Sequence, residues 1–392
     1  MTDLETRVAP PRPALLRRAA PALLGYAAVR ALGLAALVVW SAARGKDAYT
    51  LLTARWDSLW YARVAELGYG YEVRLPNGDV HSDLAFFPLL PWLERLLHTV
   101  TPLSYADAGF AVSLVASLTA AAGVFAVADH VYGPLYGGRV GACAVLLWAV
   151  LPVGVVQSMA YSESLFTALA AWSLYAVLTG RWVSAGVLAA LAGLTRPVGA
   201  AVVAAVWVAG AVGFVRERSL RHTPRAPARH RALGMLLAPL GAAGYVLWVG
   251  RRTGGGPFGY LDVQAGWRNG FDGGYAFARF VAGEFTSFPS VLAGIGLVTG
   301  VVLLIWWYLT GIRQRQPVEL LVYTGVVLAL ALGASSYFGS KPRLLLPAFP
   351  VLLPLACALA RLRTSRSVSL TAGLAVVSAL YGAFWLNGSG PP

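Results

Sequence analysis

Long apolar runs, separated only by short polar segments, follow one another along almost the whole of this sequence. A helix needs about 20 apolar residues to cross roughly 30 Å of hydrocarbon. Windows of about that length lie near residues 20–43, 104–128, 139–157, 162–180, 182–195, 197–215, 232–250, 288–310, 318–335, 344–361 and 368–386. The chain is 58% hydrophobic and only 12% charged, whereas about a quarter of the residues in a soluble domain are charged. The sequence therefore predicts an all-α integral membrane protein with about eleven transmembrane helices.

The predicted spans leave little of the chain outside the membrane domain. We expect a cytoplasmic N-terminal tail at 1–19, a single polytopic membrane domain at 20–386 and a C-terminal tail at 387–392. The first apolar run is long, precedes further spans and lacks a small-residue cleavage site, so it predicts a retained span. Arg196 and Pro197 interrupt the apolar stretch 182–215, which is either one broken helix or two short ones.

Basic residues mark one side of the predicted membrane domain. If the N-terminus is cytoplasmic, every cytoplasmic segment contains arginine, and most Asp and Glu residues fall outside. The arginines concerned are Arg7, Arg12, Arg17, Arg18, Arg139, Arg181, Arg216, Arg218, Arg221, Arg225, Arg229, Arg231, Arg313, Arg315, Arg361, Arg363 and Arg366. This distribution satisfies the rule that short cytoplasmic loops are enriched in Lys and Arg.

The formal net charge of +14 is therefore mostly an orientation signal. The basic residues are scattered over short loops and form no single platform interleaved with aromatics, so we predict no nucleic-acid partner. The densest run, RERSLRHTPRAPARHRA, either only sets the orientation or also contacts anionic membrane lipids.

Most of the polar residues on the predicted outer side lie in two long loops, at 44–105 and 251–288. Loops of this length are usually functional or disordered, and their Trp, Tyr and Phe content argues against disorder. His81 and Asp83 in the first loop are two potential metal ligands without a third at matching spacing. The chain also lacks an Asp-x-Asp pair, the usual holder of a divalent ion in nucleotide-sugar enzymes. We predict no metal and no cofactor.

The segment TARWDSLWYARVAELGY in the first loop has the pattern of an amphipathic helix. At 3.6 residues per turn, Trp56, Leu59, Trp60, Val64 and Leu67 form one apolar stripe, with Arg63 and Glu66 on the opposite side. We expect this helix to lie in the membrane interface, where tryptophan is favoured. Asp57 lies about 100° around the helix from the first stripe residue. It is therefore expected at headgroup depth and turned away from the lipid, where a lipid-phosphate substrate exposes its head.

Five motifs, RWDSLWYARVAELGY, AFFPLLPWL, YSESLF, LTRPVG and KPRLLLPAFP, occur in the order and spacing of a known family. The chain resembles the PIG-V family, the integral-membrane mannosyltransferases that add the second mannose of GPI anchors, and their bacterial relatives. The resemblance covers about residues 45–350. It implies the GT-C class of glycosyltransferases, a polyprenyl-phosphate sugar as donor, and Asp57 in the place of the acid of the first external loop.

The resemblance leaves the acceptor open among a lipid, a glycan and a protein, because the bacterial relatives do not generally occur in cells that make GPI anchors. Mannose is likewise implied by the resemblance, and another prenyl-phosphate sugar such as arabinose would require much the same residues. Lysine is scarce, with only Lys46 and Lys341, which indicates a GC-rich bacterial gene. We expect a bacterial cell membrane protein with an extracytoplasmic active site.

Sugar transfer with inversion needs a carboxylate that accepts the acceptor's proton and cationic groups that stabilise the leaving phosphate. Asp57 is the candidate base. Arg196, Lys341 and Arg343, at the external ends of predicted spans, are the candidate phosphate ligands. Alternatively, Asp57 is a helix-face residue paired with an arginine such as Arg55, and the three cationic residues are interface anchors.

Five further residues are candidates for substrate binding. Trp56 flanks the candidate base, and Glu163 in YSESLF either belongs to the site or caps a helix N-terminus. Gln264, Trp267 and Arg268 in QAGWR either line the sugar or acceptor site or pack the second external loop.

A transporter or lipid flippase is the competing class. Such a protein is expected to contain internal repeats, broken helices near the midplane and ionisable residues deep in its spans. The sequence shows no convincing repeat, and Arg30 is the only clearly mid-span charge. A purely structural membrane subunit is a third class, but it would not need an acid-rich first loop. The clustering of carboxylates on one predicted face favours an interfacial enzyme.

Overall fold

The described part of the chain is almost entirely helical, which confirms the predicted all-α class. The computed structural model describes residues 15–220, 227–388 and 390, so Arg7, Arg12, Arg221, Arg225 and parts of both predicted tails lie outside the described residues. The α-helices are α1 (Leu15–Ala43), α2 (Ala48–Thr53), α3 (Asp57–Leu67), α4 (Leu89–Val100), α5 (Tyr105–Tyr136), α6 (Arg139–Ala149), α7 (Ser162–Leu178), α8 (Trp182–Gly193), α9 (Ala200–Leu220), α10 (Ala228–Leu237), α11 (Leu240–Thr253), α12 (Gly259–Gly266), α13 (Tyr275–Glu284), α14 (Ser290–Arg313), α15 (Val318–Gly333), α16 (Lys341–Leu344), α17 (Leu353–Arg361) and α18 (Thr364–Leu386). The 3-10 helices are η1 (Asp83–Ala85), η2 (Gly154–Ser158), η3 (Pro197–Gly199), η4 (Gly256–Phe258), η5 (Phe338–Ser340) and η6 (Phe349–Leu352), and the strands are β1 (Glu72–Arg74) and β2 (Val80–Ser82).

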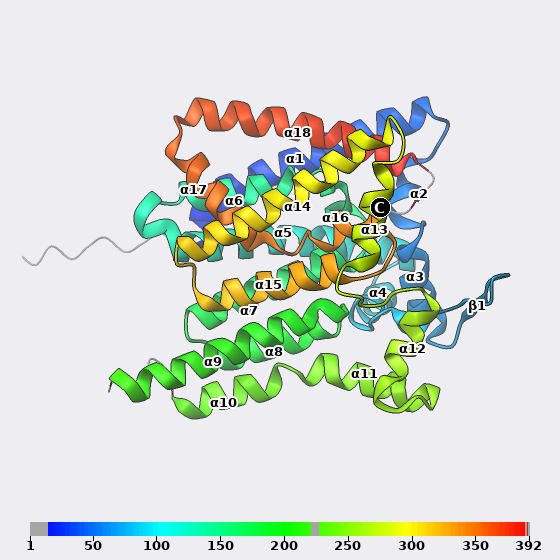
Figure 1. The fold of residues 1–392 in the computed structure, drawn as a ribbon, viewed down its shortest axis with the longest axis horizontal. Helices are drawn as coiled ribbons and strands as arrows, with labels where there is room; N and C mark the ends of the chain where they lie inside the picture. Colours follow the sequence, from blue (N-terminus) through cyan, green and yellow to red (C-terminus); the bar gives the residue numbers. More distant parts are fainter. Residues whose placement is uncertain (1–14, 221–226, 389, 391–392) are drawn as a thin grey trace, which may run out of the picture.

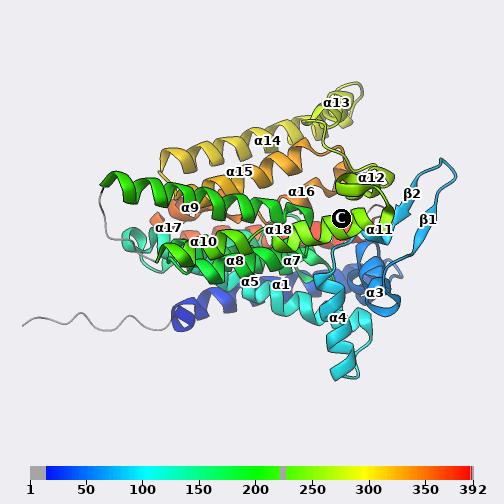
Figure 2. The same ribbon diagram turned by 90° about the horizontal axis from the view of Figure 1, so that it is seen from below.

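The long helices lie side by side with roughly parallel axes (Figures 1 and 2). Helices α2, α3, α4, α12 and α13 gather with the antiparallel β1–β2 pair at one end of this bundle, which we call the hairpin end. The first described turn of α1 and the connection between α17 and α18 lie at the opposite end. Both predicted external loops therefore meet at the same end of the molecule.

Six helices in the described residues are long and apolar enough to cross a membrane, or up to seven if one bent pair counts as a span. The bent pair is Phe338–Leu344 with Phe349–Arg361. Four shorter apolar helices, α6, α7, α8 and α15, have only 10–17 residues, which is less than the roughly 20 residues that a straight crossing needs. The integral-membrane class is supported, and the figure of about eleven spans remains a prediction.

The apolar stretch 182–215 forms two helices. Helix α8 ends at Gly193, Pro197 begins the short η3, and α9 begins at Ala200. A side chain on Gly199 would lie 2.6 Å from the Cα of Gly193, so the close approach of the two segments requires glycine. The break places Arg196, in extended conformation, at the turn between them.

The predicted mid-span charge, Arg30, has a structural partner. Its buried guanidinium donates to the carbonyls of Ala149 and Gly154, where the chain breaks between α6 and η2. Gln157 donates to the carbonyl of Trp148 at 2.8 Å at the same break. Unpaired carbonyls at membrane depth cost several kcal/mol each, so Arg30 compensates for a helix break instead of forming a transport pathway.

A bend of 75° separates the segment that contains α16 from α17. Two buried aromatic side chains satisfy the carbonyls at this bend. Trp148 donates its indole N–H to the carbonyl of Leu346 at 3.0 Å, and Tyr323 donates its hydroxyl to the carbonyl of Pro347 at 2.9 Å. These contacts hold α16, and with it Arg343, against the rest of the bundle.

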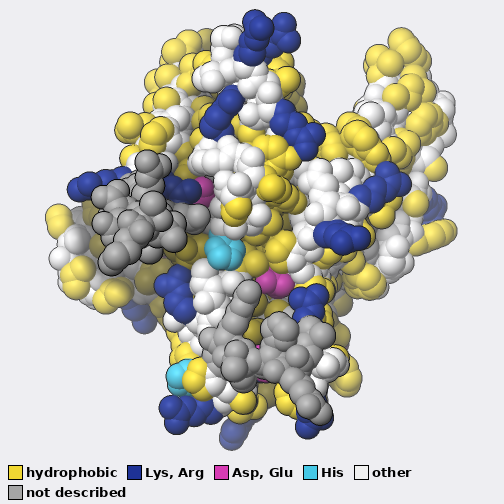
Figure 3. All heavy atoms as spheres, turned by 90° about the vertical axis from the view of Figure 1, so that its left-hand side faces the viewer, with side chains coloured by type: hydrophobic (Ala, Val, Ile, Leu, Met, Phe, Trp, Pro, Cys, Tyr) yellow, Lys and Arg dark blue, Asp and Glu magenta, His cyan; other side chains and the backbone are white. Residues whose placement is uncertain are grey.

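Figure 3 shows the end of the molecule opposite the hairpin end, with Lys and Arg side chains spread over its periphery and few Asp or Glu side chains. Helices begin or end here at Arg139, Arg313 and Arg361. The charge distribution matches the one predicted for a cytoplasmic side.

The predicted amphipathic stripe on α3 is only partly exposed, and its place in the membrane interface stays a prediction. The face of α3 that packs against the protein is Ser58, Tyr61, Val64 and Ala65. Val64 is buried, whereas Leu59 and Leu67 of the same predicted stripe are exposed.

Helix α4 carries a further exposed apolar stripe. Trp92, Leu96 and Val100 follow at intervals of four residues and are all exposed. Figure 2 shows α4 at the hairpin end, pointing away from the direction of the long helices. This arrangement suits a helix that lies in the membrane interface.

Candidate active site

Asp57 is the first residue of α3, directly after a tight turn. Trp56 has φ of 53°, a left-handed conformation that residues other than glycine seldom adopt. Ser58 closes the turn, because its hydroxyl accepts from the N–H of Arg55 at 2.9 Å and donates to the Arg55 carbonyl at 2.7 Å. A carboxylate at a helix N-terminus is favoured by the helix dipole. The turn thus fixes Asp57 at the hairpin end.

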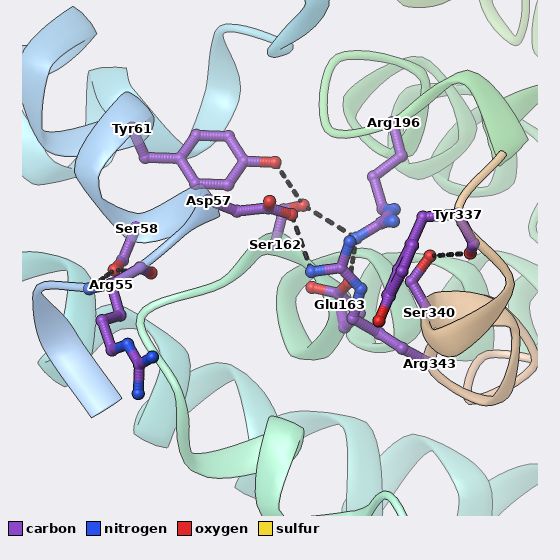
Figure 4. Close-up of polar contacts among 10 residues, drawn as sticks. All are labelled: Arg55, Asp57, Ser58, Tyr61, Ser162, Glu163, Arg196, Tyr337, Ser340 and Arg343. Atoms are coloured by element: carbon purple, nitrogen blue, oxygen red, sulfur yellow. Dashed lines mark hydrogen bonds and ion pairs between the residues drawn. The ribbon is translucent and has the colours of Figure 1, made fainter. Parts of the chain in front are cut away.

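Asp57 joins a chain of alternating charges with three residues from distant parts of the sequence (Figure 4). Arg343 on α16 donates from Nη1 to Oδ2 of Asp57 at 2.7 Å, across 286 residues of sequence. Its Nε lies 3.2 Å from Oε1 of Glu163, near the start of α7, and Arg196 forms an ion pair with the same carboxylate oxygen. Four predicted site residues are therefore brought together.

The four charges differ in their access to solvent. The side chain of Glu163 is 1% exposed, those of Arg343 and Arg196 are 10% and 13% exposed, and that of Asp57 is 25% exposed. Buried charges are tolerated when they are paired, and the four form two positive and two negative groups. Asp57 is the carboxylate of the cluster that a substrate can reach.

Sequence analysis did not identify Tyr61 and Ser162, which extend the cluster through hydrogen bonds. The Tyr61 hydroxyl lies 2.8 Å from Oγ of Ser162, and Arg196 donates to that same oxygen at 3.3 Å. Burial raises the pKa of the Tyr61 phenol, although Arg196 opposes this effect, so the phenol stays protonated at neutral pH. Tyr61 follows Asp57 by four residues, so both side chains lie on the same face of α3. This spacing is the sequence signal that could have identified Tyr61.

Both guanidinium groups keep N–H donors available for a substrate. An arginine has five such donors. Among the described residues, Arg343 contacts the carboxylates through Nη1 and Nε, and Arg196 contacts Glu163 and Ser162 through Nη1. The ring of Tyr161 lies 5.1 Å from Cζ of Arg343 and further orients this group. The cluster can therefore bind a phosphate without giving up its internal ion pairs.

Lys341 does not join this cluster. Its buried ammonium donates to the carbonyls of Ala331 and Ala334, at 2.8 and 2.7 Å, at the end of α15. The rings of Phe277 and Phe338 lie 4.9 and 5.5 Å from the same nitrogen. Lys341 therefore caps the C-terminal end of α15. This contact does not match its predicted role as a ligand of the donor phosphate.

No hydrogen bond or ion pair in the described residues links Gln264, Trp267 or Arg268 to the four charged side chains. Gln264 donates to the hydroxyl of Tyr260 at 2.6 Å. The side chain of Arg268 is 68% exposed and pairs with Asp79 of the hairpin at 2.5 Å. The predicted roles of these residues in sugar or acceptor binding therefore remain predictions without a direct contact to Asp57.

Trp267 belongs to an aromatic cluster that ties α3 to the second external loop. Its ring centroid is 4.9 Å from that of Trp60, 5.5 Å from that of Phe86 and 4.0 Å from that of His81. Its indole N–H donates to the carbonyl of Ser82 at 3.0 Å. Trp60 accordingly packs against protein aromatics, which corrects its predicted role as a lipid anchor.

Trp56 lies in the turn before Asp57 and is partly buried against the main apolar core. The guanidinium of Arg55 stacks over its ring at 4.0 Å. Asp57 pairs with Arg343 and makes no ion pair with Arg55 in the described chain. The alternative pairing considered from the sequence is therefore wrong, and Trp56 remains a candidate substrate contact by position.

No three His, Cys, Asp or Glu side chains within residues 15–220 and 227–388 are grouped so that they could hold a metal ion. His81 of the predicted loop pair stacks on Trp267. The buried Asp83 carboxylate accepts from the backbone N–H groups of Gly70 and Tyr71. Both side chains thus have structural contacts of their own.

Comparison with known proteins gives a partial family match and a likeness of fold. Residues 38–225, a little under half of the chain, match the family model Mannosyltransferase (PIG-V). The structure of ArnT from Cupriavidus metallidurans in the apo state aligns with a TM-score of 0.51 and 18% identity, over 86% of this chain and 60% of ArnT. The apo oligosaccharyltransferase of Archaeoglobus fulgidus aligns with a TM-score of 0.49 and 14% identity, over 92% of this chain and 56% of that protein. No curated protein sequence matches the chain.

The family match confirms the predicted resemblance to PIG-V mannosyltransferases, and the ArnT alignment shows a GT-C-like fold. The chain is therefore similar to membrane glycosyltransferases of the mannosyltransferase type, in sequence over residues 38–225 and in fold over most of its length. It spans less than two thirds of the length of ArnT. The matched segment contains Asp57, Glu163 and Arg196 and ends before Arg343, whose ion pair with Asp57 is seen only in the structure.

Proposed function

We propose that this protein transfers mannose from a polyprenyl-phosphate-mannose donor to a hydroxyl of an extracytoplasmic acceptor, with inversion at the anomeric carbon. The observation that carries the proposal is the ion pair between the partly exposed Asp57 and the buried Arg343, with Arg196 in the same cluster. The family match supports mannose as the sugar. The site lies at one end of the helix bundle, where a prenyl phosphate would present its headgroup (Figure 1).

The proposed reaction is one displacement. The acceptor oxygen forms a bond to the anomeric carbon as its proton passes to Asp57, and the bond between that carbon and the phosphate oxygen breaks. The electron pair of the broken bond stays on the prenyl phosphate, whose added charge Arg343 and Arg196 stabilise. Asp57 then releases its proton to solvent or to the leaving phosphate. Attack opposite the leaving group inverts the configuration.

The geometry favours different roles for the two carboxylates, Asp57 and Glu163. Among the described residues, Asp57 uses Oδ2 for its ion pair, so Oδ1 is open to the acceptor hydroxyl. Glu163 is buried between two guanidinium groups, where it positions both and is out of reach of an acceptor. A general base must come within hydrogen-bond distance of the proton it removes, which favours Asp57 over Glu163.

The donor is tested by incubating the purified full-length protein with radiolabelled polyprenyl-phosphate mannose and membranes from a strain that lacks the gene. We expect labelled product to form in the presence of EDTA and without added GDP-mannose, because arginines can stabilise the single phosphate in place of a metal ion. A strict requirement for a divalent ion together with a nucleotide sugar would contradict the proposed donor.

The orientation of the site is tested with single cysteines in a variant whose native Cys143 and Cys357 have been replaced. Asn77→Cys at the exposed hairpin turn should react with a membrane-impermeant maleimide in intact cells, whereas Thr364→Cys at the start of α18 should react only after permeabilisation. The positive-inside distribution predicts this outcome. The reverse pattern would move the active site to the cytoplasm.

A further inference from the structure

The turn that leads into α3 holds one residue in a strained conformation. Trp56 has φ of 53° and ψ of −122°, a combination that residues other than glycine seldom adopt. Such strain persists only where the surrounding structure holds the residue in place, and it is common at active sites. Since Trp56 immediately precedes Asp57, the groups that hold this turn also set the position of the candidate base.

Arg55 is the residue of this turn whose side chain reaches a distant helix. Its guanidinium lies over the ring of Trp56, with Cζ 4.0 Å from the ring centroid. Nη1 of the same group donates to the carbonyl of Leu386 at 3.4 Å, at the end of α18 and 331 residues further along the chain. Figure 4 shows the Arg55 side chain pointing away from Asp57 and Arg343. Arg55 therefore links the turn to α18 and lies outside the charged cluster.

The end of α18 is held firmly against the first part of the chain. Helices α1 and α18 pack side by side (Figure 1), and Leu386 and Asn387 are buried. The amide of Asn387 donates to Oγ of Ser41 on α1 at 3.0 Å, and Lys46 donates to the Asn387 carbonyl at 2.6 Å. The last carbonyls of a helix lack partners within it and carry a partial negative charge. This helix end is therefore a fixed anchor that favours the cations Lys46 and Arg55.

A planar guanidinium is suited to make both contacts of Arg55 at once. Its face stacks on an aromatic ring while its N–H groups donate in the plane. The ring of Trp56 is also partly buried against the main apolar core, so it cannot turn away without losing that packing. The backbone of the turn is closed by the hydroxyl of Ser58. Together these contacts hold Trp56 in its strained conformation.

We propose that Arg55 is a positioning residue, which holds the turn against the end of α18 and thereby keeps Asp57 in place for the reaction. The inference rests on the proposed function, because it takes Asp57 as the base. Asp57 lies 2.7 Å from Nη1 of Arg343, and a displacement of about 1 Å in an active site can lower a rate on the order of 10²-fold. The first residue of the RWD motif thus acts on the base through the turn, without an ion pair to it.

Arg55→Met tests this role, because it removes the charge and the N–H donors and keeps a long side chain beside Trp56. We expect the turnover number of the purified full-length protein to fall roughly 10-fold, since the base is displaced. The KM for polyprenyl-phosphate mannose should keep its wild-type value, because Arg196 and Arg343 are untouched. Wild-type turnover, or a raised donor KM in place of lowered turnover, would overturn the inference.

Two further substitutions at the same position separate charge from bulk. Arg55→Lys should recover most of the turnover, because an ammonium can also lie over Trp56 and donate to the Leu386 carbonyl. Arg55→Gln is uncharged and too short for both contacts, so it should match Arg55→Met and takes its place if that variant does not fold. Equal turnover in the lysine and glutamine variants would contradict the role of the cation.

Lys46→Met is the matched control, because Lys46 caps the same end of α18 from the segment between α1 and α2. Among the described residues, Lys46 forms no hydrogen bond with the turn that precedes Asp57. Its variant should therefore retain wild-type turnover. An equal loss of turnover in Lys46→Met and Arg55→Met would show that α18 needs only positive charge at its end, and Arg55 would be a helix cap without a positioning role.

Hydrogen–deuterium exchange tests the hold on the turn without reference to activity. In the full-length protein, Arg55→Met should accelerate exchange several-fold in peptides that contain the turn and the start of α3, whereas Lys46→Met should accelerate it only at the end of α18. Unchanged exchange at the turn in Arg55→Met would overturn the inference. If the wild-type protein transfers no mannose from polyprenyl-phosphate mannose, the proposed function is contradicted, and the exchange experiment still decides whether Arg55 holds the turn.

Discussion

Asp57→Asn should lower the turnover number for mannose transfer by roughly 10² or more, the usual scale for loss of a general base. Asparagine keeps the shape of the side chain and can still accept a hydrogen bond from Arg343, but it cannot take the acceptor's proton. The KM for polyprenyl-phosphate mannose should change little, because the carboxylate acts on the acceptor and the guanidinium groups act on the phosphate. Steady-state transfer measured over a range of donor concentrations separates the two quantities.

The control for this variant is Glu72→Gln, which alters an exposed ion-paired carboxylate of the hairpin at the same end of the molecule. Among the described residues, Glu72 forms an ion pair only with Arg74, at 3.8 Å, and none with the charged cluster. Its variant should retain wild-type turnover. A correctly folded Asp57→Asn protein with wild-type turnover would mean that Asp57 is only a surface residue, and the base would then have to be sought at Glu163.

The helix that begins at Asp57 could be predicted from the sequence, whereas the partner of Asp57 could not. The pattern around RWDSLW predicted a helix and a polar residue at headgroup depth, since both depend on neighbouring residues. The ion pair instead depends on the fold, which brings α16 to α3 across 286 residues. From the sequence alone, the nearby Arg55 was the partner considered, because an arginine does not reveal which distant carboxylate it meets.

Lys341 and Trp60 are residues whose predicted roles were wrong because the sequence does not show their distant contacts. A lysine at the end of an apolar segment has the same appearance in sequence whether it binds phosphate or caps a helix, and only the carbonyls of Ala331 and Ala334 distinguish the two. A tryptophan in an amphipathic pattern is compatible with a lipid interface and equally with a cluster of protein aromatics. The cluster partner of Trp60, Trp267, lies on a different loop, and periodicity within α3 cannot indicate it.

Helix boundaries were predicted best where a residue near the boundary, such as a proline, sets them. The proline after Arg196 predicted a break in the apolar stretch 182–215, and the structure shows two helices there. The choice between one broken helix and two depended on the close packing of Gly193 and Gly199, which lie on either side of the turn. Arg30 was recognised as unusual for a span, but its role became clear only with the broken carbonyl ladder at Ala149 and Gly154.

Glu163→Gln should produce the largest loss of stability in the cluster. Its carboxylate is 1% exposed and is the group that separates the guanidinium groups of Arg196 and Arg343. Removal of one partner from a buried ion pair costs about 3–5 kcal/mol, because the remaining charge is left unpaired. The thermal unfolding midpoint in detergent should fall accordingly. The KM for donor should rise roughly 10-fold, the equivalent of about 1.4 kcal/mol, because both phosphate ligands lose their orientation.

The matched control is Glu217→Gln, which breaks an ion pair with the buried Arg231. Glu217 is 26% exposed, so water can replace part of the lost interaction, and the shift in midpoint should be clearly smaller. Donor KM should be unchanged, since this pair has no contact with Arg196 or Arg343. Equal destabilisation by the two variants with normal donor KM in both would show that Glu163 is only one more structural charge. Loss of turnover at Glu163→Gln with full stability and normal donor KM would instead make Glu163 the base, and the roles assigned to the two carboxylates would have to be exchanged.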